Sequence, residues 1–207
     1  MQRTAANRSG VWLGALALIV LAACSTASDE PQGSDEIIPL AKGNYWIYET
    51  TTVDKEGNSG NSSLDTMRVI GSREVSSKDG GSATWFEVYG FMVKDTILLK
   101  TRPDGLWMID KLGREVHYYR TDIKRGETYE RPPAFNIMLQ DTNATVNTAA
   151  GKFSGLQYME RFGNAPSATT YYFAPGIGLV EWVATNVMMT NGSEGSVRTT
   201  LKESNLQ

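Results

Sequence analysis

Residues 44–53 read NYWIYETTTV, and this stretch gives the clearest indication of the fold class. Aromatic and β-branched side chains dominate it, and such residues fit the pleated, half-buried surface of a β-strand. Because successive strand residues point to opposite faces, Tyr45 and Ile47 lie on one face, whereas Trp46 and Tyr48 lie on the other. We therefore predict a β-strand here.

Strand-like patterning continues through most of the chain, and no window carries a sustained apolar stripe at helical spacing. The best helix candidate is PAFNIMLQ at residues 133–140, which is short. We expect further strands at residues 64–75, 83–91, 96–102, 106–110, 115–120, 142–148, 155–162, 168–173, 178–190 and 196–203. Roughly ten strands joined by short turns, with at most one short helix, predict an all-β fold: an antiparallel sheet, a sandwich or a partly open barrel.

Glycine and proline mark where the predicted strands turn. Pro103 presets the backbone angle of a turn and Gly105 supplies a positive φ, which together predict a hairpin. Residues 54–63 (DKEGNSGNSS) have the composition of a mobile loop, and Gly90 interrupts the alternation of its strand, as a bulge does. In APGIGLV at residues 174–180 the glycines precede a strand and not a helix, so we predict a tight bend instead of a phosphate-binding loop.

The amino terminus has the organisation of a secretion signal. Arg3 and Arg8 precede an uncharged apolar run at residues 11–23, which is the order of a secretion signal. The run is shorter than the about 20 residues that cross a bilayer as a helix. It ends in LAAC, where Cys24 is the only cysteine of the chain. This sequence resembles the lipobox of bacterial lipoproteins, which implies that residues 1–23 are a signal peptide and that Cys24 carries a diacylglycerol and an acylated amine.

A lipid anchor at Cys24 would hold the protein on a membrane. Each buried CH₂ group contributes about 0.8 kcal/mol, and two or more acyl chains anchor a protein stably. Residue 25 is serine, and not the aspartate that resembles an inner-membrane retention signal, so we expect a bacterial envelope protein on the outer membrane, facing the periplasm. An ordinary secreted protein with a chance cysteine near its cleavage site is the alternative.

A short polar segment separates this anchor from the body of the protein. Residues 25–36 read STASDEPQGSDE and offer nothing to bury, so we predict a lipidated cysteine and flexible tether at residues 24–36. Such a chain has a root-mean-square span of about 20 Å. Residues 37–207 are long enough for a single β-rich domain with its own core. The net charge is −3 at pH 7 and no basic cluster occurs, so nucleic acid is not an expected partner.

Three motifs of the body are similar to a pattern in β-rich bacterial envelope lipoproteins of unassigned function. They are GNYWIY at residues 43–48, AGKF at residues 150–153 and YFAPGIGLV at residues 172–180. The resemblance spans most of the body and implies a β-rich envelope lipoprotein, but it implies no activity. In physical terms the motifs are architectural, because aromatic residues pack strands and glycine and proline form bends.

No catalytic or metal-binding set stands out in the sequence. His117 is the only histidine and no G-x-S-x-G elbow occurs, so we predict a surface or half-buried strand residue and not a triad member. One histidine and a lipidated cysteine cannot assemble the usual zinc ligands. The polar side chains of residues 54–61 lack the spacing of an EF-hand calcium loop. A carboxylate pair for glycoside hydrolysis depends on three-dimensional separation, so the sequence leaves it open.

Aromatic residues and methionines are frequent in the body of the chain. They suit an apolar cavity or an adaptable binding face, but they also fill the core of a β protein without disulfides, and we favour the core. Met188 and Met189 are the exception to follow. As neighbours in a strand they face opposite sides, so one of them is expected to be exposed or to lie in a pocket.

These observations predict a membrane-anchored envelope lipoprotein that acts as a binding module for a protein partner or an apolar small-molecule ligand. A protein partner would be an outer-membrane assembly that contacts a sheet edge or an aromatic face. We expect no cofactor and no enzymatic activity. A carboxylate-dependent hydrolase of envelope polymers is the alternative, and two acids at a glycosidase separation in a cleft would favour it.

Overall fold

The structure is a computed structural model that describes residues 36–78, 81–189 and 192–207, all of which belong to one compact unit. Within these ranges every regular element is a β-strand, and the twelve strands form one antiparallel sheet. The strands are β1 (Tyr45–Asp54), β2 (Ser59–Ser77), β3 (Gly81–Tyr89), β4 (Thr96–Arg102), β5 (Gly105–Ile109), β6 (Glu115–Arg120), β7 (Thr128–Arg131), β8 (Phe135–Thr148), β9 (Gly151–Phe162), β10 (Ala168–Ala174), β11 (Gly178–Met188) and β12 (Glu194–Asn205). The described segments hold no helix that could cross a membrane. The predicted all-β fold is confirmed.

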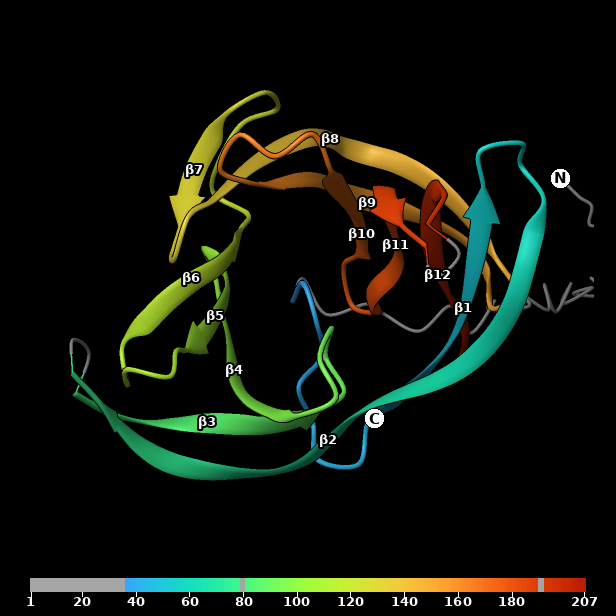
Figure 1. Cartoon of the computed structure of the whole chain (residues 1–207). Helices are drawn as coiled ribbons and strands as arrows, with labels where there is room; N and C mark the ends of the chain where they lie inside the picture. Colours follow the sequence, from blue (N-terminus) through green and yellow to red (C-terminus); the bar gives the residue numbers. More distant parts are fainter. Residues whose placement is uncertain (1–35, 79–80, 190–191) are drawn as a thin grey trace, which may run out of the picture. The chain divides into compact units, whose positions relative to one another are not determined.

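The sheet is a meander whose first and last strands meet in its middle. Each strand pairs with the next one in sequence, except that β6 and β7 do not pair, whereas β1 pairs with β12. The order across the sheet is therefore β7 to β12, followed by β1 to β6. The sheet curls until its two edge strands, β6 and β7, approach each other (Figure 1). Among the predicted alternatives, the sheet thus forms a nearly closed barrel.

β1 lies at the centre of the sheet and has the predicted alternation. Trp46 and Tyr48 are 0% and 5% exposed and belong to the core, whereas Tyr45 on the opposite face is only half-buried. Tyr45 pairs with Asn205 of β12, close to the end of the chain. One aromatic strand therefore supplies large core side chains and also joins the two halves of the meander.

The bend predicted at residues 174–180 is confirmed and contacts this strand. β10 ends at Ala174, β11 begins at Gly178, and the N–H of Ile177 donates to the carbonyl of Ala174 across the turn (2.9 Å). Trp46 Nε1 donates to the carbonyl of Ile177 (2.6 Å). Gly178 has a φ of 106°, and a Cβ there would lie 3.4 Å from the indole nitrogen, so glycine is required. The motifs at residues 43–48 and 172–180 therefore contact each other in the folded protein.

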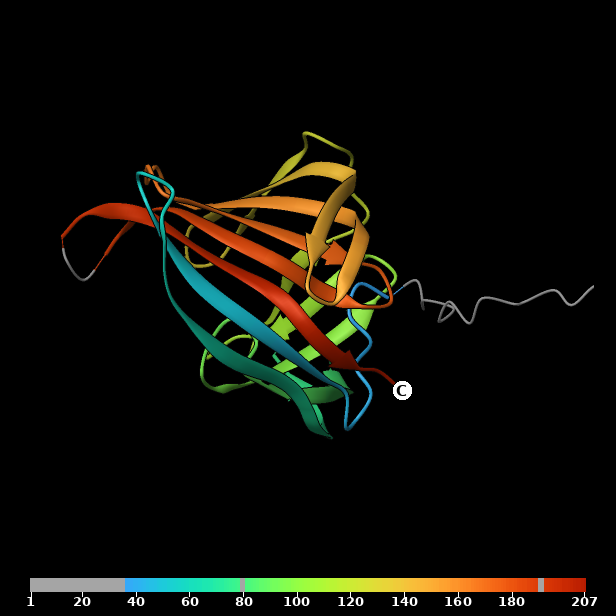
Figure 2. The same ribbon diagram turned by 90° about the vertical axis from the view of Figure 1, so that its right-hand side faces the viewer.

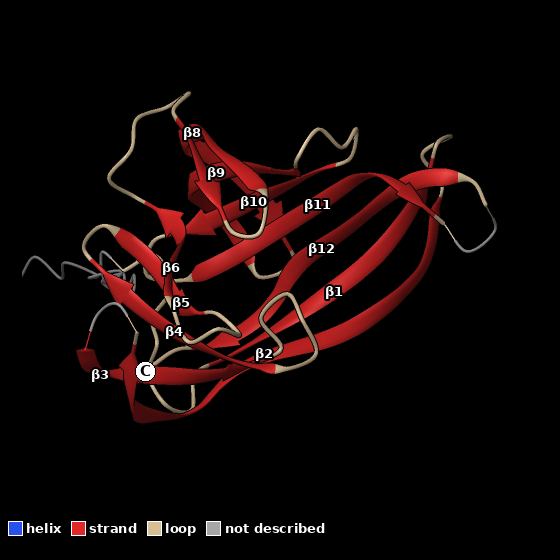
Figure 3. Cartoon of the chain, turned by 60° about the vertical axis from the view of Figure 1, so that its left-hand side comes forward, coloured by secondary structure: helices blue, strands red, loops and turns tan. Residues whose placement is uncertain are grey.

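Side chains fill the interior of the barrel. Residues 36–44 run inside the ring at one end, beside the β10–β11 bend (Figures 1 and 2). Ile37 and Ile38 are at most 2% exposed, and Thr101 Oγ1 donates to the carbonyl of Ile38 (3.1 Å). Viewed from another side, the strands wrap around this core and the loops gather at the two ends (Figure 3). The largest fully buried side chains include Trp46, Trp85, Tyr119, Tyr158, Phe91 and Phe173.

Side chains also close the gap between the edge strands β6 and β7. The Tyr129 hydroxyl donates to the carbonyl of Tyr118 (3.0 Å) and accepts from the N–H of Arg120 (3.2 Å). Arg131 Nη1 donates to the same Tyr118 carbonyl (3.3 Å), and Tyr158 Oη donates to the carbonyl of Arg120 (2.6 Å). We call this set of contacts the seam. It satisfies backbone groups of an edge strand that would otherwise lack partners.

Residues 133–140, the best helix candidate in the sequence, form no helix. Most of this segment belongs to β8, which pairs with β7 on one side and β9 on the other. Ile137 and Leu139 are at most 1% exposed, whereas Asn136 is exposed, so the segment alternates with a period of two. Pairing on both sides outweighs a weak local preference for helix.

Other boundaries differ from the prediction as well. β2 begins at Ser59, inside the predicted loop at residues 54–63, because its first residues pair with β1. Gly90 does not form a bulge: β3 ends at Tyr89, and Gly90, with a φ of 81°, starts the β3–β4 loop. β7 was not predicted, because its sequence TYER is short and polar.

Replacing Tyr129 by phenylalanine removes only the hydroxyl that bridges the seam. We expect the free energy of unfolding to fall by about 1–2 kcal/mol, because the Arg120 N–H loses its acceptor. Urea unfolding measures this difference. Tyr89→Phe is the matched control, since the Tyr89 hydroxyl has no hydrogen bond within the described ranges and the side chain is 37% exposed. Equal losses in the two variants would contradict a stabilising role for the seam.

Candidate ligand-binding site

An apolar hollow of about 540 Å³ lies at one end of the barrel. The β3–β4 loop, the β5–β6 turn and the β7–β8 turn surround it. We call it the mouth pocket, and its lining consists of Phe91, Val93, Asp95, Ile97, Met108, Ile109, Asp110, Lys111, Leu112, Arg114, Val116, Tyr118, Pro132 and Pro133. Four of these residues are charged and the others are apolar or aromatic. Ligand sites typically have roughly 300–1,000 Å³ and mostly apolar walls, and this pocket meets both criteria.

The β5–β6 turn on the rim of the mouth pocket is held by its own first residue. Asp110 Oδ1 accepts the N–H groups of Leu112 (2.8 Å) and Arg114 (2.9 Å), and the Arg114 guanidinium binds Oδ2 (2.7 Å). These hydrogen bonds, led by that from the Arg114 N–H, lower the pKa of Asp110. Gly113 has a φ of 78°, which completes the turn between β5 and β6. Leu112 is left 59% exposed at the tip.

The β3–β4 loop, residues 90–95, forms the opposite wall. The N–H of Gly90 donates to the carbonyl of Asp95 (3.1 Å) and closes the loop, and a Cβ at Gly90 would collide with the Thr66 carbonyl. Phe91 points inward, is 1% exposed and contacts the Tyr118 ring (centroids 5.9 Å apart). Val93 points outward and is 50% exposed. The loop therefore presents one apolar side chain to the core and another to the pocket rim.

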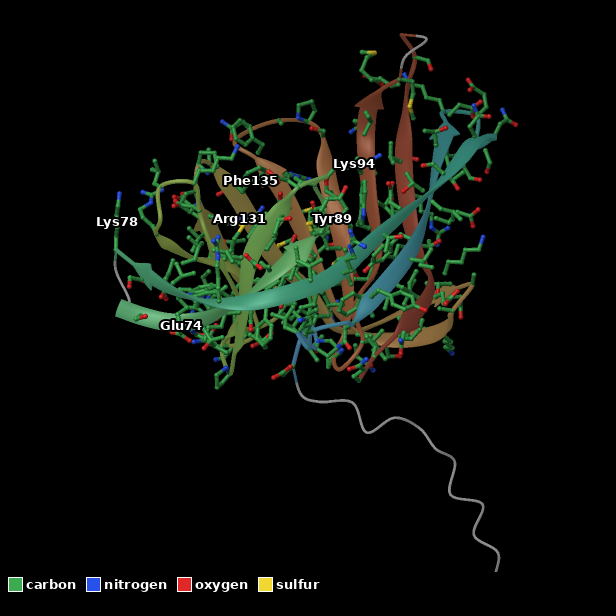
Figure 4. All side chains as sticks on the ribbon, turned by 90° about the horizontal axis from the view of Figure 1, so that it is seen from below. Glu74, Lys78, Tyr89, Lys94, Arg131 and Phe135 are labelled. Carbon is green, nitrogen blue, oxygen red and sulfur yellow. The ribbon has the colours of Figure 1, made fainter. Side chains whose placement is uncertain are left out.

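A second hollow of about 280 Å³ lies on the other side of the same loop. We call it the side pocket, and its lining consists of Tyr48, Thr50, Leu64, Asp65, Thr66, Met67, Tyr89, Gly90, Phe91, Met92, Val93, Lys94, Leu179, Trp182 and Thr199. Lys94 binds Asp65 at its rim (3.3 Å), and Figure 4 shows Lys94 close to Tyr89. Phe91 and Val93 line both pockets, so the loop is a shared wall.

A buried ion pair lies beneath the mouth pocket. Arg131 of β7 binds Glu160 of β9 (2.7 Å), and both side chains are less than a tenth exposed. The Tyr119 hydroxyl donates to the same carboxylate (3.3 Å). The Arg131 guanidinium lies 4.0 Å from the ring centre of Tyr118 and 4.8 Å from that of Phe135, and Figure 4 shows Arg131 beside Phe135. Tyr118 thus touches the ion pair on one side and the mouth pocket on the other.

Burial governs the protonation of this cluster. It raises the pKa of Glu160, while Arg131 and the Tyr119 hydroxyl oppose the rise by stabilising the carboxylate. It also raises the pKa of Tyr119, Tyr129 and Tyr158, so these hydroxyls stay protonated and act as donors at neutral pH. The cluster is therefore a fixed polar contact in which each charged group has a partner, which is the arrangement expected of a structural pair.

The other candidates from the sequence lie outside this site. His117 is a half-buried residue of β6, as predicted: its ring stacks on Trp107 (centroids 4.1 Å apart), Nε2 bonds to the Asp104 carbonyl (2.9 Å), and burial lowers its pKa. Met188 is 67% exposed, as expected of one of the two methionines. Cys24, the predicted lipidation site, lies outside the described residues.

The buried or turn-forming acidic residues of the described ranges are engaged in contacts within the protein. Asp54 receives two hydrogen bonds from Asn58, which hold the β1–β2 turn. No group of three or more His, Cys, Asp or Glu side chains in the described ranges could hold a metal ion. Three glutamates with nearly buried side chains each bind an arginine: Glu115 with Arg102, Glu160 with Arg131 and Glu181 with Arg198. Each of these carboxylates therefore serves as the partner of an ion pair in this structure.

Sequence reasoning missed both the mouth pocket and the ion pair beneath it. The pocket combines residues from three separate turns, and Arg131 and Glu160 lie on strands that are not neighbours. Local sequence placed only one part of the rim, because the strands predicted at residues 106–110 and 115–120 leave a turn between them.

Comparisons with known proteins identify no family for this chain. No family model matches it, and no curated protein matches it. A solved structure of a proposed lipoprotein from Parabacteroides distasonis ATCC 8503 is similar with 14% identity and a TM-score of 0.42, covering 84% of this chain and 100% of that one. A proposed exported protein with a YmcC-like fold from Bacteroides fragilis NCTC 9343 is similar with 15% identity and a TM-score of 0.44, covering 81% and 98%. With TM-scores below 0.5, neither likeness is an argument for what this chain does.

The ion pair predicts a specific pattern of stability in mutants. Arg131→Met leaves Glu160 buried without its cation, and we expect a loss of about 3–5 kcal/mol in the free energy of unfolding. The double variant Arg131→Met/Glu160→Gln should recover most of that loss, because no buried charge remains. Urea unfolding measures both. Arg120→Met is the control, since Arg120 pairs with Asp122 at the surface, where such pairs contribute about 0–1 kcal/mol. A double variant no more stable than the single one would contradict this account.

Proposed function

We propose that this protein is a lipid-anchored envelope protein whose barrel binds an apolar ligand in the mouth pocket. One observation carries the proposal: an open hollow of about 540 Å³ whose walls are mostly apolar, at the end of a barrel whose core holds large buried side chains. Water in contact with such walls is unfavourable, so an apolar group that displaces it is stabilised by roughly 25 cal/mol for each Å² of apolar surface buried.

The location follows from the amino terminus. The LAAC sequence supports lipidation of Cys24 after removal of residues 1–23, and residues 24–36 would tether a single β-rich domain at 37–207 to the membrane. Serine at position 25 supports the outer membrane, with the body in the periplasm. An anchored body keeps the mouth pocket within the envelope, where apolar ligands are abundant.

A protein partner is the second candidate occupant. Val93 and Leu112 stand 50% and 59% exposed on the rim of the pocket, and a filled core with apolar side chains at the surface also suits a partner that inserts one apolar side chain. A carboxylate-dependent hydrolase has less support, because the nearly buried glutamates each bind an arginine. We therefore propose a binding role and not an enzymatic one.

Leu112→Asp tests the mouth pocket directly. A carboxylate at the rim should weaken the binding of the neutral apolar dye phenylnaphthylamine by about tenfold or more, because an apolar contact is lost and a charge must be desolvated. Dye fluorescence during titration measures the affinity. Met188→Asp is the control: Met188 is 67% exposed and lines neither pocket. Equal affinities in the two variants, or no dye binding by the parent protein, would refute the proposal.

Cys24→Ser tests the anchor separately. The variant lacks the thiol that would receive the lipid, so we expect the protein to move from the membrane fraction to the soluble fraction of disrupted cells. Immunoblots of the two fractions measure the distribution. Ser25→Ala leaves the thiol in place and should stay with the membranes. A Cys24→Ser protein that still sediments with membranes would argue against lipid anchoring.

A further inference from the structure

The two pockets have the arrangement of one elongated site divided by a single loop. Phe91 and Val93 line both the mouth pocket and the side pocket, and both hollows have largely apolar walls. An apolar ligand that entered the mouth pocket and continued past Phe91 would reach Trp182 in the side pocket. A linear molecule fits this path better than a compact one. This inference rests on the proposed function and specifies the ligand of the same site.

The dividing loop is held by few strong contacts. Apart from the buried Phe91, three contacts hold the loop. The N–H of Gly90 donates to the carbonyl of Asp95, and the Tyr118 hydroxyl makes a weak contact with the Met92 sulfur (3.8 Å). The third contact is the exposed ion pair between Lys94 and Asp65. Met92 also has a φ of 58°, which is unfavourable for a residue other than glycine. A ligand can therefore shift this loop without breaking the strand ladder around it.

The rim of the mouth pocket carries one cation that is not already engaged. Arg114 and Asp110 bind each other, and Asp95 Oδ1 accepts the N–H of Thr96 (2.7 Å). The Lys111 ammonium, by contrast, has no ion-pair partner anywhere in the described ranges. The side-pocket cation, Lys94, is neutralised by Asp65. Charge complementarity therefore favours an anionic group at the mouth end of the path.

We propose that the ligand is a single-chain fatty acid, bound with its carboxylate beside Lys111 and its methyl end beside Trp182. The carboxylate stays at the wet rim, so it keeps most of its hydration while it gains the attraction of the ammonium. The acyl chain replaces water along the mouth pocket, passes Phe91 and ends in the side pocket. No bond is made or broken, so the protein acts as a carrier or sensor of this amphiphile.

Tryptophan quenching tests the path of the chain. Stearic acid with a nitroxide near its methyl end is added to the full chain carrying Cys24→Ser, and the same acid with the nitroxide near the carboxylate is the comparison. We expect stronger quenching by the methyl-end label, and loss of that difference in Trp182→Phe, which keeps an aromatic ring in place. Equal quenching by the two labels, stronger quenching by the carboxylate-end label, or a difference that survives in Trp182→Phe would overturn the proposed path.

Reversing the charge at the rim tests the head group. Lys111→Glu should weaken stearate binding by about tenfold and weaken phenylnaphthylamine binding much less, because only stearate carries a charge that the substitution repels. Lys202→Glu, an exposed residue of β12 outside both pockets, makes the same charge change and should affect neither ligand. Unchanged stearate affinity in Lys111→Glu would overturn the anionic ligand. If the dye binds and responds to Leu112→Asp but the stearate tests fail, only this inference falls; if the dye does not bind, the proposed function falls with it.

Discussion

The pairing of β1 with β12 is the constraint on which the rest of the structure depends. It joins the first and last strands in the middle of the sheet, so the free edges fall on β6 and β7, in the middle of the chain. The two edges are consecutive in sequence and cannot separate far. Even so, they do not form a backbone ladder. Closure of the barrel is left to side chains: the hydroxyls of Tyr129 in β7 and Tyr158 in β9 bond to backbone groups of β6.

This closure explains why polar and charged groups lie in the interior. Tyrosine has an apolar ring that packs in the core and a hydroxyl that reaches an edge carbonyl, so it meets both needs at the seam. The longer Arg131 side chain also packs in the core and donates to an edge carbonyl, that of Tyr118, and Glu160 compensates its positive charge. A lone buried cation would be costly, whereas a bound pair with a further donor from Tyr119 is tolerated. The polar cluster is thus a consequence of how the barrel ends, and the mouth pocket lies directly above it.

The sequence predicted what depends on local periodicity and missed what depends on distant partners. Alternation placed β1, and the proline and glycines placed the β10–β11 bend, because strand facing and positive φ are properties of a few consecutive residues. The strand character of residues 133–140 comes from pairing with β7 and β9, which the sequence of that segment alone does not reveal. β7 itself has only four residues and is a strand because β8 is beside it. The pockets and the Arg131–Glu160 pair form only when the whole sheet curls, so no local sequence pattern predicts them.

The position of the termini has one more consequence. Asn44 Oδ1 accepts the N–H of Gln207 (2.9 Å), so the start of the sheet and the end of the chain are neighbours in space. Read from β7 through β12 and on through β1 to β6, the barrel is a plain up-and-down meander in which every partner is next in line. A circular permutant that joined these ends and opened between β6 and β7 would keep every ladder. In it, β1 and β12 would still pair, but they would be neighbours in sequence. The natural chain order is therefore expected to fold more slowly than the permuted order, because loop-closure entropy makes pairings between distant strands slow to form.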